Sequence, residues 1–262
     1  MPFALGSDGE LYYETAGSGP PLLFITGLGG LASFWRNQIE AFSSRYTVIA
    51  FDHRGTGKSA RTDAPYSIEQ MAADTLALMD HLGVEQPIIV GHSTGGAIGL
   101  CIAANHAQRV QRLALSATWT HADPYFRRLF ETRRQVLVHG DGPLYQRLSA
   151  LVLFPPEWIA QNEAALRERE ALAPRDPLDI RILIRRIDAL LQHDGRDWAR
   201  AVRCPTLIVV ARDDAVTPAY FSRALAALIP HATLNVLDQG GHSAPVTQPQ
   251  AYNAALNALL VG

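Results

Sequence analysis

Cysteine and lysine are scarce in this chain of 262 residues, which contains two cysteines and one lysine, Lys58. Cys101 and Cys204 lie in apolar segments, so we expect buried, reduced thiols rather than a disulfide. No segment approaches the roughly 18–20 consecutive apolar residues that a membrane-spanning helix needs. Residues 1–8 lack the basic and apolar regions of a secretory signal. These absences predict a cytoplasmic protein that does not enter a membrane.

An excess of charge of either sign is also absent, because 23 basic and 25 acidic residues give a net charge of -2. Such a balance predicts little attraction to nucleic acid or to anionic lipid. The sequence contains no internal repeat, and its nine histidines show no metal-ligand spacing such as H-E-x-x-H. We therefore expect a small-molecule substrate, no metal or organic cofactor, and a monomer or homodimer.

Short apolar segments alternate with longer amphipathic ones along most of the chain, which is typical of an α/β fold with a mostly parallel sheet. A hairpin is expected around Ser7-Asp8-Gly9, since this turn signal separates two strand-like segments. The eight expected strands cover residues 3–6, 10–15, 21–25, 47–51, 87–90, 110–115, 206–210 and 234–237. The pattern predicts a sheet of eight strands with helices on both faces.

Helices are expected at residues 33–42, at 67–82, from Thr94 onward and at 249–260. Ser67 and Gln70 have the spacing of a capping box at the start of the second helix. Residues 119–197 have helical periodicity and no convincing strand. We therefore predict a core formed by residues 1–118 and 198–262, with 119–197 inserted as a helical cap over one edge of the sheet.

The strongest chemical signal is Gly91-His92-Ser93-Thr94-Gly95, which matches G-x-S-x-G between an expected strand and an expected helix. Such a turn strains the backbone of its central residue and requires small neighbours. It also directs the N-terminus of the helix towards the serine hydroxyl. We interpret Ser93 as a nucleophile, and a structural turn serine is the alternative.

A nucleophilic serine needs a base, and in proteins with this motif an acid and then a histidine follow the serine along the chain. Asp213 and Asp214 follow the expected strand 206–210, and we favour Asp214, four residues before Pro218. Asp213 is expected to cap the turn or to face solvent. His242 follows the last strand on a glycine-rich loop from which it can reach both partners. An exposed loop histidine is the alternative.

One other motif resembles a nucleotide-binding loop. Residues 55–59, with the sequence Gly-Thr-Gly-Lys-Ser, end like a phosphate-binding P-loop. That motif requires a first glycine at position 52, where this chain has Asp52. We therefore do not expect nucleotide binding.

Taken in order, four blocks resemble the α/β-hydrolase superfamily: Thr26-Gly27-Leu28-Gly29, the segment Asp52 to Ser59, the Ser93 turn, and Asp214 with His242. The resemblance implies an α/β-hydrolase fold, a serine hydrolase mechanism and a loop at residues 26–30 that helps to bind an oxyanion. It assigns the two oxyanion donors to the backbone N–H groups of Leu28 and Thr94. A plain turn at this loop is the alternative. Thr26 stands where many family members have histidine.

A narrower resemblance is to the aminoacrylate hydrolases of pyrimidine utilisation (the Rut pathway). It rests on Gly27-Leu28-Gly29-Gly30 with Trp35, on residues 66–72, on residues 153–158 and on Gly240-Gly241-His242. The 3-oxoadipate enol-lactonases share much of this pattern. The resemblance implies hydrolysis of a small ester, lactone or aminoacrylate-like substrate. A carboxylesterase and a ligand receptor with vestigial activity remain alternatives.

The predicted cap is expected to roof the substrate pocket. Candidate pocket residues are Trp35, Trp119, Phe154, Trp158, Arg185 and Arg186. For each aromatic residue, packing in the core is the alternative. Either arginine could pair with a substrate carboxylate, although solvated helix faces are the favoured interpretation of both.

Overall fold

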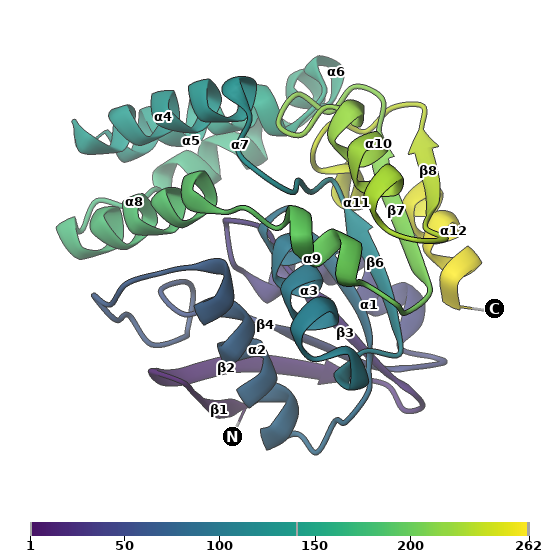
Figure 1. Cartoon of the computed structure of the whole chain (residues 1–262). Helices are drawn as coiled ribbons and strands as arrows, with labels where there is room; N and C mark the ends of the chain where they lie inside the picture. The colour runs from purple at the N-terminus through teal and green to yellow at the C-terminus, as the bar shows by residue number, and fades with distance from the viewer. Residues whose placement is uncertain (1, 140, 261–262) are drawn as a thin grey trace.

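The computed structural model describes residues 2–139 and 141–260, which fold into one eight-stranded sheet with helices on both faces (Figure 1). The strands are β1 (Phe3–Gly6), β2 (Gly9–Ala16), β3 (Pro21–Ile25), β4 (Thr47–Phe51), β5 (Ile88–His92), β6 (Arg112–Ser116), β7 (Thr206–Ala211) and β8 (Thr233–Leu237). Their order is β1-β2-β4-β3-β5-β6-β7-β8. Strand β2 pairs antiparallel with β1 and β4, and the remaining pairs are parallel. The predicted fold class is confirmed.

The central strands are apolar along their whole length because both faces of the sheet are covered. In β3, Leu23 and Ile25 belong to one hydrophobic cluster, whereas Leu22 and Phe24 belong to a second cluster on the opposite face. This alternation follows from the two-residue period of a strand. A strand that buries both faces therefore reads as an unbroken apolar segment rather than an alternating one.

The helices of the core divide between these two clusters. The bounds are α1 (Arg36–Phe42), α2 (Ile68–His81), α3 (Thr94–Asn105), α9 (Arg196–Ala201), α10 (Ala219–Leu228), α11 (Ala244–Thr247) and α12 (Pro249–Leu260), with short 3-10 helices at Ala32–Trp35 and Ala107–Arg109. Residues of α2, α3, α9 and α10 pack in the first cluster. Residues of α1, α11 and α12 pack in the second. Both faces of the sheet are thus covered, which leaves the carboxyl ends of its strands as the place for a site.

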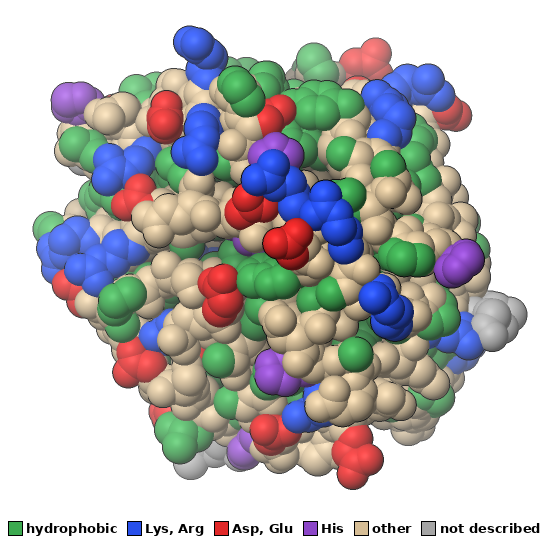
Figure 2. All heavy atoms as spheres, in the orientation of Figure 1, with side chains coloured by type: hydrophobic (Ala, Val, Ile, Leu, Met, Phe, Trp, Pro, Cys, Tyr) green, Lys and Arg blue, Asp and Glu red, His purple; other side chains and the backbone are tan. Residues whose placement is uncertain are grey.

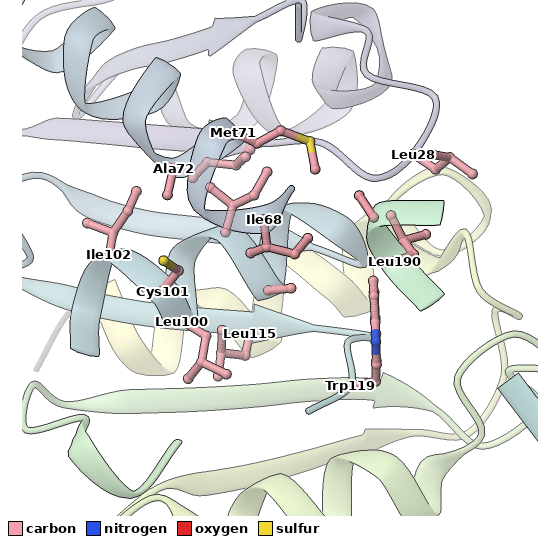
Figure 3. Packing of buried hydrophobic residues seen from close by; sticks show 14 of the residues in the cluster. Leu28, Ile68, Met71, Ala72, Leu100, Cys101, Ile102, Leu115, Trp119 and Leu190 are labelled. Atoms are coloured by element: carbon pink, nitrogen blue, oxygen red, sulfur yellow. The ribbon is translucent and has the colours of Figure 1, made fainter. Parts of the chain in front are cut away.

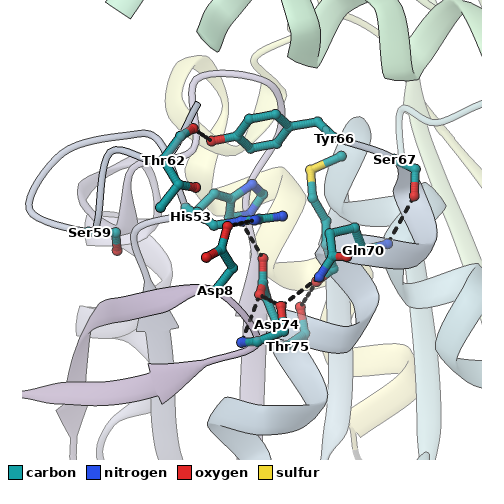
Figure 4. A network of polar contacts seen from close by, with 12 residues as sticks. Asp8, His53, Ser59, Thr62, Tyr66, Ser67, Gln70, Asp74 and Thr75 are labelled. Carbon is teal, nitrogen blue, oxygen red and sulfur yellow. Dashed lines mark hydrogen bonds and ion pairs between the residues drawn. The ribbon is translucent and has the colours of Figure 1, made fainter. Parts of the chain in front are cut away.

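The start of α2 forms only one of the two hydrogen bonds of the predicted capping box. Ser67 Oγ accepts a hydrogen bond from the Gln70 backbone N–H at 3.1 Å, as a capping box requires. The Gln70 side chain donates instead to Ser7 Oγ in the β1–β2 turn. Asp74 of α2 accepts from the same Ser7 hydroxyl (Figure 4). The first turn of α2 is therefore hydrogen-bonded to the β1–β2 hairpin, and the Gln70 side chain does not complete the capping box.

Five helices lie between β6 and α9: α4 (Pro124–Val138), α5 (Gly142–Leu153), α6 (Pro156–Gln161), α7 (Glu163–Ala171) and α8 (Pro177–Gln192). They gather at one end of the molecule (Figure 1). The two ends of this segment meet, because His121 forms an isolated antiparallel bridge with Asp194. The Gly195 N–H also donates to the Thr120 carbonyl at 2.6 Å. We call residues 119–197 the cap.

On the face drawn in Figure 2, arginine and acidic side chains are interspersed rather than gathered by sign. Ion pairs within the described residues include Arg196 with Asp194 and Arg134 with Asp188. None of the helices within the described residues is both long and apolar enough to cross a membrane.

Candidate active site

Ser93 occupies a strained turn between β5 and α3. Its backbone angles are φ 54° and ψ -117°, in a region that residues with a side chain rarely adopt. The surrounding sheet holds this conformation: the Ser93 N–H donates to the Ser116 carbonyl at 2.8 Å, and Thr118 Oγ1 donates to the Ser93 carbonyl at 2.8 Å. The turn is therefore fixed from both sides, as a nucleophile elbow requires.

The two glycines of the motif are there because the chain passes itself closely. A Cβ on Gly91 would lie 2.2 Å from the Gly95 carbonyl oxygen. A Cβ on Gly95 would lie 2.0 Å from the Ile25 carbonyl oxygen, at the end of β3. Real Cβ atoms essentially never approach this closely. Helix α3 thus starts in contact with the strand that leads into the Gly27–Gly30 loop.

Asp214 and His242 meet at the adjacent ends of β7 and β8. The His242 Nδ1 atom lies 2.9 Å from Asp214 Oδ2 and 3.1 Å from Oδ1, and both residues are buried. Asp214 Oδ1 also accepts the backbone N–H groups of Val216 (2.7 Å) and Thr217 (2.9 Å), and Oδ2 accepts the Thr217 hydroxyl at 3.0 Å. The carboxylate is held by its own turn and presents Oδ2 to the imidazole.

Burial and hydrogen bonding act in opposite directions on this carboxyl group. Burial alone would raise the pKa of Asp214, but the charge and ring N–H of His242 and the Thr217 and Val216 N–H groups outweigh it and lower the pKa. Asp214 is therefore ionised at neutral pH and can only accept hydrogen bonds. The proton between the two side chains belongs on His242 Nδ1, which leaves Nε2 free to act as a base.

His92, the residue before Ser93, connects this pair to the elbow. Its ring centroid lies 4.9 Å from that of His242 and 5.0 Å from that of Phe34. Its Nδ1 lies 3.1 Å from Ser116 Oγ. Burial and the nearby His242 lower the pKa of His92 well below its ordinary value, although Asp214 opposes the shift. His92 is thus a neutral packing partner, and it places His242 beside the serine turn.

Asp213, the weaker candidate for the acid, has a different task. Its Oδ1 accepts the Gly241 backbone N–H at 2.9 Å, while the residue remains exposed. It therefore orders the loop that carries His242 without touching the ring. This arrangement favours Asp214 over Asp213 as the partner of the histidine.

The Gly27–Gly30 loop lies against the elbow: a Cβ on Gly27 would be 3.1 Å from the Ser93 Cβ. Within residues 2–139 and 141–260, neither the Leu28 nor the Thr94 backbone N–H donates to another part of the protein. Two unpaired N–H groups close to a serine are what an oxyanion hole requires. The geometry is compatible with the donors that the sequence predicts.

The Asp52–Ser59 turn is hydrogen-bonded to the C-terminal end of this loop. Asp52 Oδ1 accepts the Ala32 N–H at 2.8 Å. The Gly30 carbonyl accepts both the His53 N–H (2.8 Å) and the Thr56 hydroxyl (3.1 Å). The turn therefore holds the end of the loop in the way that the family resemblance implies.

The candidate pocket residues are dispersed. Trp35 is fully buried in the second cluster, where it packs on Phe24. Trp119 is fully buried at the entry to the cap. Phe154 stacks on Trp158 with ring centroids 4.3 Å apart. These positions leave core packing as the simplest account of Trp35.

The two cap arginines have different surroundings. Arg185 is partly exposed and pairs with Asp63, with Nη2 3.2 Å from the carboxylate. Arg186 is completely buried and donates to the Arg54 and Leu28 carbonyls. A sequence signal for this burial was present: Arg186 lies four residues after Ile182 and four before Leu190, so all three share one face of α8.

The sequence reading missed contacts from the cap to the loops that carry Asp214 and His242. The Ser243 N–H, next to His242, donates to the Leu153 carbonyl at 2.9 Å. The Tyr125 hydroxyl of α4 donates to the Ala215 carbonyl, next to Asp214. These bonds join a side chain or N–H to a distant backbone carbonyl and leave no pattern in the sequence.

Residues 20–249 match the family described as alpha/beta hydrolase fold, and the chain belongs to this family. It is a hydrolase by that membership and by its relatives. A protein of Azorhizobium caulinodans named "Putative carbamate hydrolase RutD" is 41% identical over 98% of this chain and 97% of its own length. A protein with the same name from Caulobacter sp. is 38% identical over 98% of each chain. The predicted membership of the α/β-hydrolase family and the predicted resemblance to the Rut-pathway hydrolases are both confirmed.

A solved structure supports the fold over the whole chain. The enol-lactonase from Burkholderia xenovorans superposes with a TM-score of 0.91 at 25% identity, covering 100% of both chains. The likeness includes the core and the cap together.

Proposed function

We propose that this protein hydrolyses a small carboxylic-acid derivative through an acyl-enzyme on Ser93, with His242 as general base and Asp214 as its orienting acid. The proposal is supported by the buried His242–Asp214 pair, with Nδ1 and Oδ2 2.9 Å apart, whose imidazole packs 4.9 Å from the ring of His92, the residue before the strained Ser93. Such a serine is a poor nucleophile until a base removes its proton. The hydrogen bond to Asp214 supports His242 as that base, with its proton on Nδ1.

The reaction follows from these positions. The Ser93 hydroxyl passes its proton to His242 Nε2 as its oxygen bonds to the substrate carbonyl carbon. The carbonyl oxygen becomes negative and is stabilised by the Leu28 and Thr94 N–H groups. His242 returns the proton to the leaving nitrogen or oxygen as its bond to carbon breaks. Water then attacks the acyl carbon as His242 takes its proton, and His242 returns that proton to the departing Ser93 oxygen, which releases the acid and restores the enzyme.

The relatives favour a substrate cleaved at a C–N bond. The two RutD proteins are carbamate hydrolases by name and share 41% and 38% of residues with this chain. The enol-lactonase shares 25%. We therefore place carbamate-like and aminoacrylate-like substrates first, and lactones and short esters second. A carbamate, a lactone and an ester each present a carbonyl carbon to the serine. The C–N bond of an aminoacrylate instead lies at an enamine or imine carbon, so on that substrate His242 would activate water without an acyl-enzyme.

Turnover of p-nitrophenyl acetate, a short carbamate and an enol lactone by wild type and by Ser93→Ala tests the proposal. Wild type should label with a fluorophosphonate and Ser93→Ala should not. The variant should lose at least about 10^4-fold in kcat on each substrate turned over by wild type. Wild-type-like turnover by Ser93→Ala would overturn the acyl-enzyme.

A further inference from the structure

We propose that Arg186 is a positioning residue that orients the Leu28 N–H for the oxyanion, so that the cap helix α8 sets the reactivity of Ser93. This inference rests on the proposed function. It is carried by the contacts of a guanidinium that lies inside the protein, between the cap and the Gly27–Gly30 loop.

The loop that carries Leu28 has little stiffness of its own. It contains three glycines in the four residues 27–30, and glycine restricts the backbone least. Its far end is fixed, because the Gly30 N–H donates to the Gly27 carbonyl at 3.0 Å and the Gly30 carbonyl accepts from His53 and Thr56. Leu28 itself is fixed by Arg186, whose Nη2 donates to the Leu28 carbonyl at 3.0 Å.

That bond acts on the geometry of the oxyanion hole. A peptide unit is planar, so anchoring the Leu28 carbonyl fixes the plane between Leu28 and Gly29. The Leu28 N–H belongs to the preceding plane, and only the two backbone angles of Leu28 separate the planes. The Leu28 side chain packs at the same end of the core as Leu190 of α8 and Trp119 (Figure 3). Together these contacts hold Leu28 in one orientation.

The other end of the guanidinium is held equally firmly. Nη1 donates to the Arg54 carbonyl at 2.8 Å, and Nη2 lies 3.2 Å from His53 Nδ1. Arg54 is in turn fixed by Asp8 (2.9 Å) and Asp74 (3.1 Å), in the network that includes Tyr66 and α2 (Figure 4). Arg186 thus connects the glycine-rich loop to a part of the core that ion pairs hold in place.

Stability alone is a poor explanation for this arrangement. The hydrogen-bond partners of the Arg186 guanidinium in the described chain are two carbonyls and a ring nitrogen, and the Tyr66 ring centroid lies 6.0 Å away; none of these groups is an anion. Burial lowers the pKa of Arg186 to about 10, which records the cost of holding a cation there. Buried charges of this kind often stabilise a fold less than apolar residues of the same size. A positive charge behind the oxyanion loop, however, favours the negative charge that forms in the transition state.

The test compares Arg186→Met with Arg133→Met. Arg133 is also a buried cap arginine, but it bonds to Tyr145 Oη (2.8 Å) and Ser149 Oγ (3.1 Å), both within the cap. Removing one oxyanion donor outright costs about 10^2–10^3-fold in kcat, so misplacing it should cost about 10–100-fold. Arg186→Met should show that loss in kcat for p-nitrophenyl acetate, with KM within about twofold. Its fluorophosphonate labelling should slow by a similar factor.

Arg133→Met should lower Tm but keep kcat within about threefold. If Arg186→Met does not fold, Arg186→Lys decides: its ammonium reaches one carbonyl, and kcat should fall about tenfold at unchanged KM. Wild-type kcat in a folded Arg186 variant, or equal losses in both methionine variants, would overturn the positioning role. Failure of the proposed function is seen separately, as activity that survives in Ser93→Ala.

Discussion

Replacing Asp214 by asparagine should reverse the polarity of the bond to His242 without changing the shape of the site. Oδ1 of Asp214 accepts two backbone N–H groups, from Val216 at 2.7 Å and Thr217 at 2.9 Å. An asparagine must therefore place its carbonyl oxygen at Oδ1, because an NH2 group there would face two donors. Its NH2 group then takes the Oδ2 position, 2.9 Å from His242 Nδ1.

In this orientation the amide donates to Nδ1, so the imidazole proton must move to Nε2. His242 can then no longer accept the Ser93 proton. We expect kcat to fall by about 10^4-fold, as for the same exchange in other serine hydrolases, which corresponds to about 5.5 kcal/mol in the barrier. Initial rates with p-nitrophenyl acetate, measured from pH 6 to 9, provide the assay.

The adjacent Asp213 is the matched control. Asp213→Asn keeps an oxygen for the Gly241 N–H, which the carboxylate accepts at 2.9 Å, so kcat should change by less than about fivefold. Equal losses in the two variants, or near-normal kcat in Asp214→Asn, would refute the tautomer argument. A large loss in Asp213→Asn alone would transfer the acid's role to Asp213.

Two further predictions concern stability. The pKa of His193 is lowered from 6.5 to about 4 by burial, so the unfolded chain binds its proton first and stability is lost as pH falls through 6.5. Between pH 7 and pH 5 this one residue should account for about 2 kcal/mol of the loss in unfolding free energy. In denaturant titrations at the two pH values, the unfolding free energy of His193→Phe should therefore fall by about 2 kcal/mol less than that of wild type. An equal fall in both proteins would contradict the burial argument. Gly95→Ala should lower Tm and abolish activity, because its Cβ would lie 2.0 Å from the Ile25 carbonyl, whereas in Gly99→Ala the nearest contact is a side-chain carbon at 3.1 Å and the effect should be small. Similar Tm values for both alanine variants would show that the elbow tolerates what its geometry forbids.

The sequence predicted the core elements well because each has a local cause. Helix α12 spans residues 249–260 as expected, since Pro249 suits the first turn of a helix. The expected helix at 33–42 is divided into a 3-10 turn and α1, because boundaries depend on packing as well as propensity. The cap is helical as expected, but its division into five helices could not be read from periodicity alone.

For the candidate site, the sequence proposes the residues but does not show what orients them. Ser93, Asp214 and His242 stand out through motif and chain order. The role of Arg186 depends on contacts with residues 132 and 158 positions away. A helical pattern indicates which face is buried, but it cannot name the carbonyl that a buried guanidinium meets. Long-range partners of this kind follow only from the folded arrangement.

The antiparallel bridge between His121 and Asp194 has a consequence for how such enzymes diversify. A segment that leaves and re-enters the core at one paired position can lengthen, shorten or be exchanged while strands β6 and β7 keep their register. The cap can therefore be exchanged without moving the strands that carry Ser93, Asp214 and His242. Any replacement would still have to supply a hydrogen-bond donor to the Leu28 carbonyl, as Arg186 does. One position of an otherwise exchangeable segment is therefore constrained by the oxyanion loop.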